Sequence, residues 1–304
     1  MKSTIEYILF AGIARTLQLL PLRAVRHAAR GFGIVVYYVL PIRKKLTLLQ
    51  LRRAFPDRPD KEIARIARQS YVNLVTTIFE LMWTPRLTDA LLPNILRIRN
   101  PEVLENARRR GSGLVLMSGH FGNWEWLNIG VPRLLGFSVT TVVHSLHNDA
   151  VDQLVESWRT MMGSRVVPMG ISIREIIRTL RSRGIIGMIA DQSGPSGAYY
   201  VRLFGRYAAT YEGPATFALR TGAPIVIGFA IRGADGNYDV ELEEISTRNL
   251  GETEEERMRE LTRRHVRALE RQVAAHPGQW LWQHKRWKHT PHAESILIED
   301  PRDA

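Results

Sequence analysis

Apolar and polar positions follow two different patterns along this chain. Across residues 60–83, apolar side chains recur at helical spacing, which predicts one long helix. From about residue 95, short β-rich apolar runs alternate with helical runs. Strands are expected at 95–98, 113–117, 139–143, 166–167, 185–189 and 224–231. Helices are expected between them, at 101–109, 124–135, 150–162 and 172–182.

This alternation predicts an α/β fold with a mostly parallel mixed sheet flanked by helices. A further strand at 238–242 follows an Asp235-Gly236 turn, which favours an antiparallel strand at the sheet edge. Thr253 and Glu256 form a capping-box pattern, so a long helix is expected to begin there and to end at about residue 275.

The first 56 residues have a different character. The apolar stretch 5–20 is interrupted by Glu6, Arg15 and Gln18, and a second stretch at 31–42 is flanked by arginine and lysine. Both are short for a membrane span, and they suit helices lying among lipid headgroups. A pair of amphipathic helices packed on the core, or one true span, stays open. We expect residues 1–56 to form a membrane-associated helical module and residues 57–304 an α/β domain.

Composition narrows the function classes. The chain has 42 Lys and Arg against 30 Asp and Glu, a net charge of +12, which predicts an anionic partner. Nucleic acid, an anionic membrane surface and an acidic protein all fit, but the sequence carries no nucleic-acid-binding motif. Because there is no cysteine, disulfides, thiolate metal sites and a catalytic thiol are excluded.

The segment 113–125 carries the candidate chemistry. An apolar strand leads through Gly119 to His120, and a turn at Gly122-Asn123 opens a helix that contains Glu125. Ligands gather at the carboxyl ends of strands in open α/β sheets, and a histidine there can act as a base. Glu125 could fold back and orient the imidazole. No nucleophile-elbow serine is evident, so the base would activate a substrate hydroxyl directly.

The block His120-Phe-Gly-Asn-Trp-Glu125 resembles the His-x4-Asp/Glu block of the lysophospholipid acyltransferase superfamily. More closely, the chain resembles the bacterial lipid A biosynthesis acyltransferases, the late lauroyl and myristoyl transferases. The other blocks that carry the resemblance lie at residues 46–56, 190–192, 201–224 and 277–288. Two positions depart from the family pattern: Gly278 stands where Glu is usual, and Gln283 where an apolar residue is usual.

The resemblance implies transfer of a fatty acyl chain from an acyl carrier protein thioester, or from CoA, to a hydroxyl of a membrane glycolipid. A lipid A precursor is the expected acceptor; a phosphatidylinositol mannoside or a lysolipid is the alternative. The expected location is the cytoplasmic face of the bacterial inner membrane. No metal, cofactor or nucleic acid is implied. From a different class, a non-catalytic basic protein that binds membrane or nucleic acid would also explain the charge.

The resemblance also assigns roles to single residues. His120 is the expected base and Glu125 its partner, while Arg159 contacts phosphate or steadies the pocket. Asp191 matches a strand-end aspartate of the family. Residue chemistry adds further candidates: backbone N–H groups at Gly119 and Gly122, or an arginine, could stabilise the oxyanion. The remaining substrate-binding candidates are Asn123, in the same turn, and the phosphate clamps Arg202 and Arg206.

Overall fold

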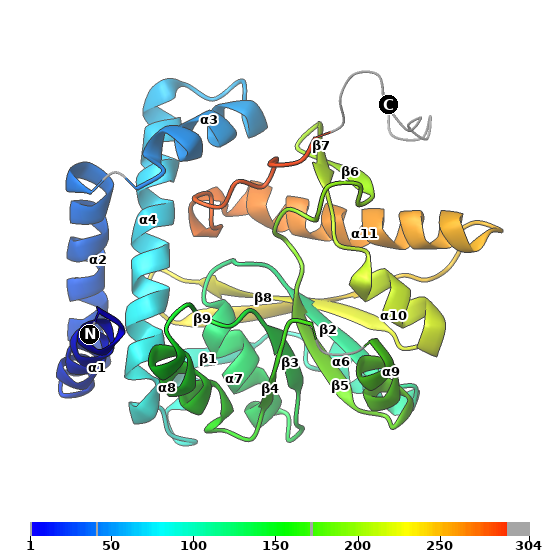
Figure 1. Ribbon diagram of the computed structural model, residues 1–304, viewed down its shortest axis with the longest axis horizontal. Helices are drawn as coiled ribbons and strands as arrows, with labels where there is room; N and C mark the ends of the chain where they lie inside the picture. The colour runs from blue at the N-terminus through cyan, green and yellow to red at the C-terminus, as the bar shows by residue number, and fades with distance from the viewer. Residues whose placement is uncertain (1, 41, 171–172, 291–304) are drawn as a thin grey trace.

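The computed structural model describes residues 2–40, 42–170 and 173–290, and a seven-stranded sheet with the order β1-β9-β8-β2-β5-β3-β4 lies at its centre (Figure 1). The strands of this sheet are β1 (Leu96–Ile98), β2 (Leu114–Ser118), β3 (Thr140–Val143), β4 (Arg165–Pro168), β5 (Ile185–Ile189), β8 (Ile225–Arg232) and β9 (Tyr238–Ile245). A separate antiparallel hairpin consists of β6 (Tyr200–Leu203) and β7 (Arg206–Ala209).

Helices precede the sheet and connect its strands. They are α1 (Lys2–Gln18), α2 (Leu22–Val39), α3 (Lys44–Ala54), α4 (Asp60–Trp83), α5 (Leu92–Ile95), α6 (Glu102–Arg109), α7 (Trp124–Leu134), α8 (Asp149–Thr160), α9 (Ile173–Arg181), α10 (Gly213–Thr221) and α11 (Glu254–Ala275). Two short 3₁₀ turns are η1 (Thr84–Arg86) and η2 (Pro277–Gln279). The strands and helices expected after residue 95 are all present, with ends moved by at most three residues. Position 172, where a helix was expected to begin, lies outside the described residues.

The pairing confirms the mostly parallel mixed sheet. Among the described strands of this sheet, only β8 and β9 pair antiparallel. The direction expected for the strand at 238–242 is therefore correct, but its expected place at the edge is wrong. β1 pairs parallel with the far side of β9, with Leu96 opposite Tyr238. This contact joins distant segments, so no local pattern in the sequence could reveal it.

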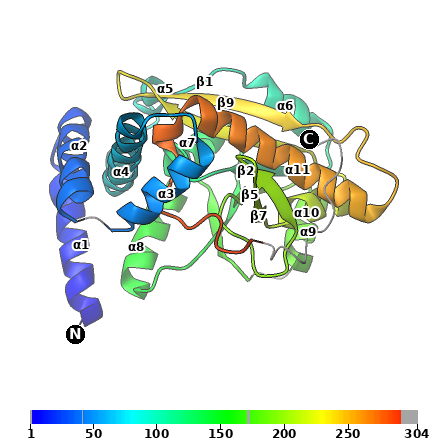
Figure 2. The same cartoon turned by 90° about the horizontal axis from the view of Figure 1, so that it is seen from above.

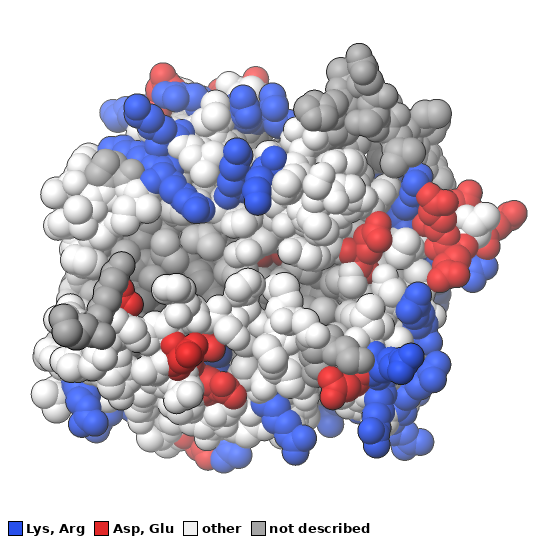
Figure 3. All heavy atoms as spheres, viewed as in Figure 1, with Lys and Arg blue, Asp and Glu red and all other residues white. Residues whose placement is uncertain are grey.

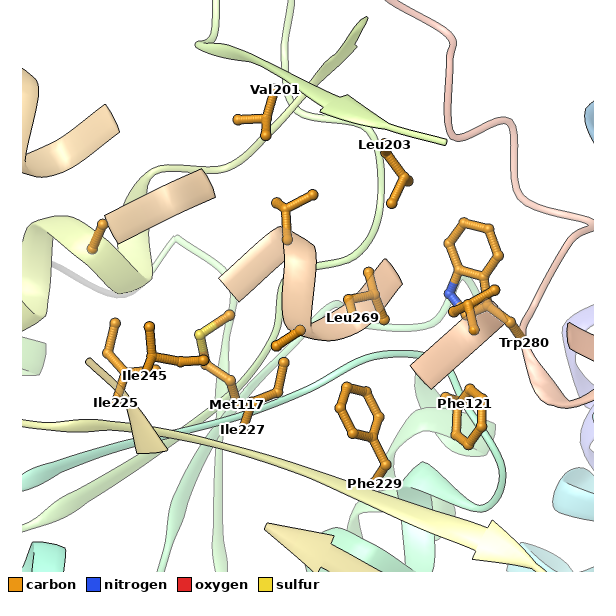
Figure 4. Packing of buried hydrophobic residues seen from close by; sticks show 14 of the residues in the cluster. Met117, Phe121, Val201, Leu203, Ile225, Ile227, Phe229, Ile245, Leu269 and Trp280 are labelled. Carbon is orange, nitrogen blue, oxygen red and sulfur yellow. The ribbon is translucent and has the colours of Figure 1, made fainter. Parts of the chain in front are cut away.

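Alternate residues of β2 build two separate core layers. Val115 and Met117 face one side of the sheet, where α9, α10 and α11 pack, and Leu114 and Leu116 face the other, where α6 and α7 pack. Figure 4 shows Met117 and Leu269 of α11 among the residues of the first layer. A strand buried on both faces is a continuous apolar run, which is the pattern of 113–117 in the sequence.

The N-terminal helices share this core. α2 runs beside α4 (Figures 1 and 2), and a Cβ added to Gly33 would lie 2.7 Å from the Cα of Val72, so this close approach requires glycine. Tyr37 and Leu51 belong to the core layer beneath α11. In the part of the chain that the structure describes, no helix is both long and apolar enough to cross a bilayer. The division at residue 56 stays a prediction.

The sequence predicted the capping box of α11 but not the β6–β7 hairpin. The capping box is confirmed, because the Glu256 backbone N–H donates to Thr253 Oγ1 and the Glu256 carboxylate accepts from the Thr253 N–H. The β6–β7 hairpin was not predicted. Phe204 and Gly205 form its turn with φ values of 50° and 69°. Phenylalanine in the left-handed region is unusual, so the sequence gives only a weak turn signal there.

A buried carboxylate ties the N-terminal helices to the sheet. Glu80 of α4 is fully buried and accepts from Arg26 of α2 at 2.7 Å, Arg232 of β8 at 3.1 Å, Asn123 at 2.9 Å and the Tyr238 hydroxyl of β9. Burial alone would raise the pKa of Glu80. The charges of Arg232 and Arg26, with these hydrogen bonds, instead hold it below its usual range. Glu80 is therefore ionised in the folded protein.

We expect Glu80→Ala to lower the free energy of unfolding by roughly 3–5 kcal/mol, because it leaves two arginines buried without their partner. Urea unfolding followed by circular dichroism measures this change. The matched control is Glu62→Ala, whose carboxylate forms partly exposed ion pairs with Arg58 and Arg65 and should cost about 1 kcal/mol or less. Equal losses in the two variants would contradict the central role of Glu80.

Candidate active site

His120 and Asp191 meet because their strands are neighbours in register. Ser118, the last residue of β2, lies opposite Ile189, the last residue of β5, in the parallel ladder. His120 follows the end of β2 by two residues and Asp191 follows the end of β5 by two residues, so the two lie together at the carboxyl edge of the sheet. This is the edge at which open α/β sheets gather ligands.

The Asp191 carboxylate accepts three hydrogen bonds. Oδ1 lies 2.7 Å from His120 Nδ1, and Oδ2 accepts from the His120 backbone N–H at 2.7 Å and from Trp280 Nε1 at 2.8 Å. The carboxylate is buried, with Asp191 only 5% exposed. A Cβ on Gly119 would lie 3.0 Å from Oδ2, so the approach of the carboxylate leaves little room for a side chain there.

The charges of this pair stabilise each other. Burial would raise the pKa of Asp191, but His120 and the hydrogen bonds hold it below its usual range. Burial would lower the pKa of His120, but the Asp191 carboxylate, aided by the charge of Glu125, raises it above its usual range. An ionised carboxylate accepts only, so Nδ1 of the imidazole carries the proton. In the neutral ring, Nε2 is then the free basic nitrogen.

Glu125 does not orient the imidazole, so this expectation was wrong. Its carboxylate binds Arg159 of α8 in a two-pronged ion pair, with Nε–Oε2 at 2.8 Å and Nη2–Oε1 at 2.6 Å. Both side chains are largely buried. The Arg159 guanidinium matches both carboxylate oxygens, while Asp191 already occupies Nδ1 of His120. Of the two roles expected for Arg159, the structure favours steadying the pocket through Glu125.

The turn that follows His120 is rigid. Gly122 has φ of 56°, and a Cβ there would lie 1.7 Å from the Ala230 carbonyl oxygen. Its N–H donates to the Gln279 carbonyl at 2.9 Å, which leaves it unsuited to the predicted role of oxyanion donor. The buried Asn123 caps α7 by accepting from the Trp126 N–H and donates to Glu80. Its contacts are therefore structural, and the substrate contact expected of Asn123 is not supported.

Arg202 and Arg206 lie outside the seven-stranded sheet, on the β6–β7 hairpin. The Arg202 guanidinium sits over the Tyr207 ring, 5.5 Å from its centroid, and Arg206 is exposed. Their role as phosphate clamps stays a prediction. Ser118, the nearest hydroxyl before His120 in the sequence, donates to the Gly228 carbonyl at 2.8 Å and is buried, so it is not poised as a nucleophile.

The segment after α11 contributes contacts to the site that were not predicted. Trp280, which was left out of the predicted site, holds Asp191. His284 Nε2 accepts from the Ser193 backbone N–H at 3.1 Å, which makes the ring the neutral Nδ1–H tautomer, and burial lowers its pKa. The buried Arg286 donates to the Ala209 carbonyl and to Thr210 Oγ1. The Trp-x-Trp-x-His spacing of this segment was the available signal.

The fold and the site define a class of protein: an α/β domain in which a buried aspartate holds a histidine at the carboxyl edge of the sheet. In the described ranges, no three His, Asp or Glu side chains are grouped to hold a metal ion.

Comparison with known proteins identifies the family. The model of the family described as "Bacterial lipid A biosynthesis acyltransferase" matches residues 1–289, and the chain belongs to this family. Among curated proteins, the chain is similar to phosphatidylinositol mannoside acyltransferase of Mycobacterium tuberculosis. Over 127 residues it is 27% identical to that of strain CDC 1551 / Oshkosh and 28% identical to that of strain ATCC 25618 / H37Rv. Each match covers 40% of this chain and 40% of the relative.

We expect Asp191→Asn to lower the pKa of His120, because the substitution removes the carboxylate charge that raises it. NMR titration of the imidazole, assigned with His120→Gln, measures the change as a shift of the midpoint to lower pH. Asp89→Asn is the matched control, since Asp89 forms an exposed ion pair with Arg133. An unchanged His120 midpoint in Asp191→Asn would contradict the assignment of Asp191 as its partner.

Proposed function

We propose that this protein transfers a fatty acyl chain from an acyl carrier protein thioester to a hydroxyl of a lipid A precursor, with His120 as general base. The observation that carries the proposal is the His120–Asp191 pair, in which Nδ1 is committed to the carboxylate and Nε2 is the basic nitrogen. Family membership supports the acyl-transfer class. His120 retains a side-chain exposure of 21%, which leaves a path for substrate.

The reaction follows from this geometry. His120 Nε2 removes the proton of the acceptor hydroxyl as its oxygen attacks the thioester carbonyl carbon. The tetrahedral intermediate then collapses with cleavage of the C–S bond, and the imidazolium returns its proton to the departing thiolate. Asp191 stabilises the imidazolium through the hydrogen bond at 2.7 Å. A thioester has a good leaving group, so no covalent enzyme intermediate is needed.

The Glu125–Arg159 pair would shape the electrostatics around the base. The Glu125 charge favours the imidazolium and the Arg159 charge opposes it. Because each neutralises the other in a two-pronged ion pair, the wall beside His120 carries little net charge. A fatty acyl chain could pass such a wall at a lower desolvation cost than an isolated charge would impose.

The acceptor has one specific alternative. The mycobacterial relatives are named for phosphatidylinositol mannoside, so an acceptor of that glycolipid type is the second candidate. Both acceptors carry phosphate, which Arg202 and Arg206 could clamp. CoA in place of acyl carrier protein is the alternative donor. The reading as a non-catalytic basic protein gives no reason for the buried His120–Asp191 pair.

We also propose that the protein works on the cytoplasmic face of the bacterial inner membrane. α1 exposes Ile5, Ile8, Leu9 and Ile13, with Ile8 62% and Leu9 60% exposed. Figure 3 shows lysine and arginine side chains gathered over α3, beside the end of α2. Apolar side chains that enter lipid, flanked by cations that meet anionic headgroups, suit an interfacial helix.

We expect His120→Ala to reduce acyl transfer from acyl carrier protein to extracted lipid by about 10²–10⁴-fold, the usual contribution of a general base. Transfer is measured by mass spectrometry of the lipid product. His147→Ala is the matched control, because His147 is exposed on the loop before α8 and should transfer at the wild-type rate. If His120→Ala transfers the acyl chain at the wild-type rate, His120 is not the general base.

We expect substitution of Ile8, Leu9 and Ile13 by Gln to weaken vesicle binding by at least about tenfold, since each buried aliphatic side chain contributes roughly 1.5–3 kcal/mol. Flotation with anionic phospholipid vesicles measures this. The control replaces three exposed apolar residues outside the N-terminal helices, Leu91, Leu146 and Met169. If both triple variants bind vesicles as the wild type does, the interfacial role of α1 is wrong.

A further inference from the structure

A cationic cavity lies apart from the candidate active site. It occupies about 1050 Å³ between α2, α4, the β8–β9 turn and the C-terminal end of α11. His120, Asp191, Glu125 and Arg159 do not line it. Seven arginines do, and those used below are Arg23, Arg26, Arg30, Arg65, Arg68 and Arg232.

The positive charge of this cavity follows from two stripes at helical spacing. Arg23, Arg26 and Arg30 recur along one side of α2, and Arg65 and Arg68 along the facing side of α4. One carboxylate, that of Asp235, belongs to the cavity wall among the described residues, and it pairs with Arg97 outside. The cavity therefore concentrates charge of one sign.

Several of these arginines lack an ionic partner. Arg26 and Arg232 share Glu80, and Arg65 lies 3.5 Å from Glu62. Within the described ranges, the remaining three form no ion pair with a carboxylate; they are Arg23, Arg30 and Arg68. Like charges held together in a partly enclosed space repel, and a bound anion would remove that cost.

Two buried hydrogen-bond donors of the cavity wall also favour a bound anion. Nη2 of Arg26 and Nη2 of Arg232 are both buried, and neither has a hydrogen-bond partner among the described residues. A buried charged N–H group without an acceptor destabilises the folded protein, and a bound anion would supply the acceptor. The wall of the cavity offers hydrogen-bond donors in excess and few acceptors, which is the composition of an anion site.

We propose that this cavity binds a ligand carrying two or more phosphate groups. Guanidinium groups bind phosphate oxygens in pairs, and several of them converge here from two helices and a strand. The volume reaches the upper end of the range of small-molecule sites, which is far more than one phosphate ion fills. The ligand is a soluble polyphosphorylated compound or a phosphorylated lipid headgroup, which share this chemistry. The inference goes beyond the proposed function and does not depend on it.

The arrangement of α2 bears on the source of the phosphate. Its cationic residues include Arg23, Arg26 and Arg30, and its exposed apolar residues include Phe32 and Val39. At about 100° per residue, the two sets lie on nearly opposite sides of the helix. If the apolar side rests on lipid, the cavity opens away from the membrane, which favours a soluble ligand.

The test compares a cavity variant with a matched control variant. The cavity variant combines three substitutions, Arg23→Gln, Arg30→Gln and Arg68→Gln. Arg109→Gln, Arg220→Gln and Arg248→Gln make the same change in net charge at exposed positions outside the cavity. All six side chains are exposed, so both variants should fold; thermal unfolding checks this. Isothermal titration with inorganic pyrophosphate should give a Kd weakened by about tenfold or more in the cavity variant, and a wild-type Kd in the control.

A second arm separates the two sources. Binding is measured to phosphatidylcholine vesicles with and without phosphatidylinositol 4-phosphate, which carries two phosphate groups. Loss of pyrophosphate binding in the cavity variant alone supports a soluble ligand, and loss of only the vesicle binding that depends on phosphatidylinositol 4-phosphate supports a lipid headgroup. If the cavity variant matches the wild type with both probes, or if the control loses as much, the site does not exist.

Discussion

The candidate site depends on one buried carboxylate. Asp191 accepts from the His120 ring, the His120 backbone and Trp280, so it joins the ends of β2 and β5 to the segment after α11. Burial of an anion is costly, and these three donors offset the cost. Two of the donors belong to His120, which the pairing of β2 with β5 brings to Asp191. Gly119 suits this arrangement, because the carboxylate leaves little room for a side chain there. The result is an imidazole of defined tautomer, with the proton on Nδ1 and Nε2 free.

Some of the arginines act inside the molecule. Arg159 binds Glu125, Arg26 and Arg232 bind Glu80, and Arg286 is buried against backbone and hydroxyl acceptors. These arginines hold helices and strands together around the site, so they are not available to an anionic partner. The cations left for partners include those that Figure 3 shows at the surface near α3, together with Arg23, Arg30 and Arg68 in the cavity between α2 and α4.

The site and the N-terminal helices are mechanically connected. The Gly122 carbonyl, two residues after His120, accepts from Asn73 and Thr77 of α4. Asn73 in turn accepts from Arg232 at 3.3 Å. α4 therefore holds the turn after His120 on one side and α2 on another. If α1 and α2 rest on the membrane, this rigid contact fixes the distance between the bilayer and the base, which positions a lipid acceptor without a flexible linker.

The sequence by itself determined the α/β class, the strand and helix positions after residue 95, the α11 cap and His120 at a strand end, because each is a local pattern of spacing or turn chemistry. It could not place β1 beside β9, nor choose between Glu125 and Asp191 as the partner of His120. Glu125 is near in sequence, but its carboxylate faces Arg159; Asp191 is distant in sequence, but in register across the β2–β5 ladder. Only the tertiary structure decides such pairings, because hydrogen bonds depend on distance in space and the strand order sets that distance.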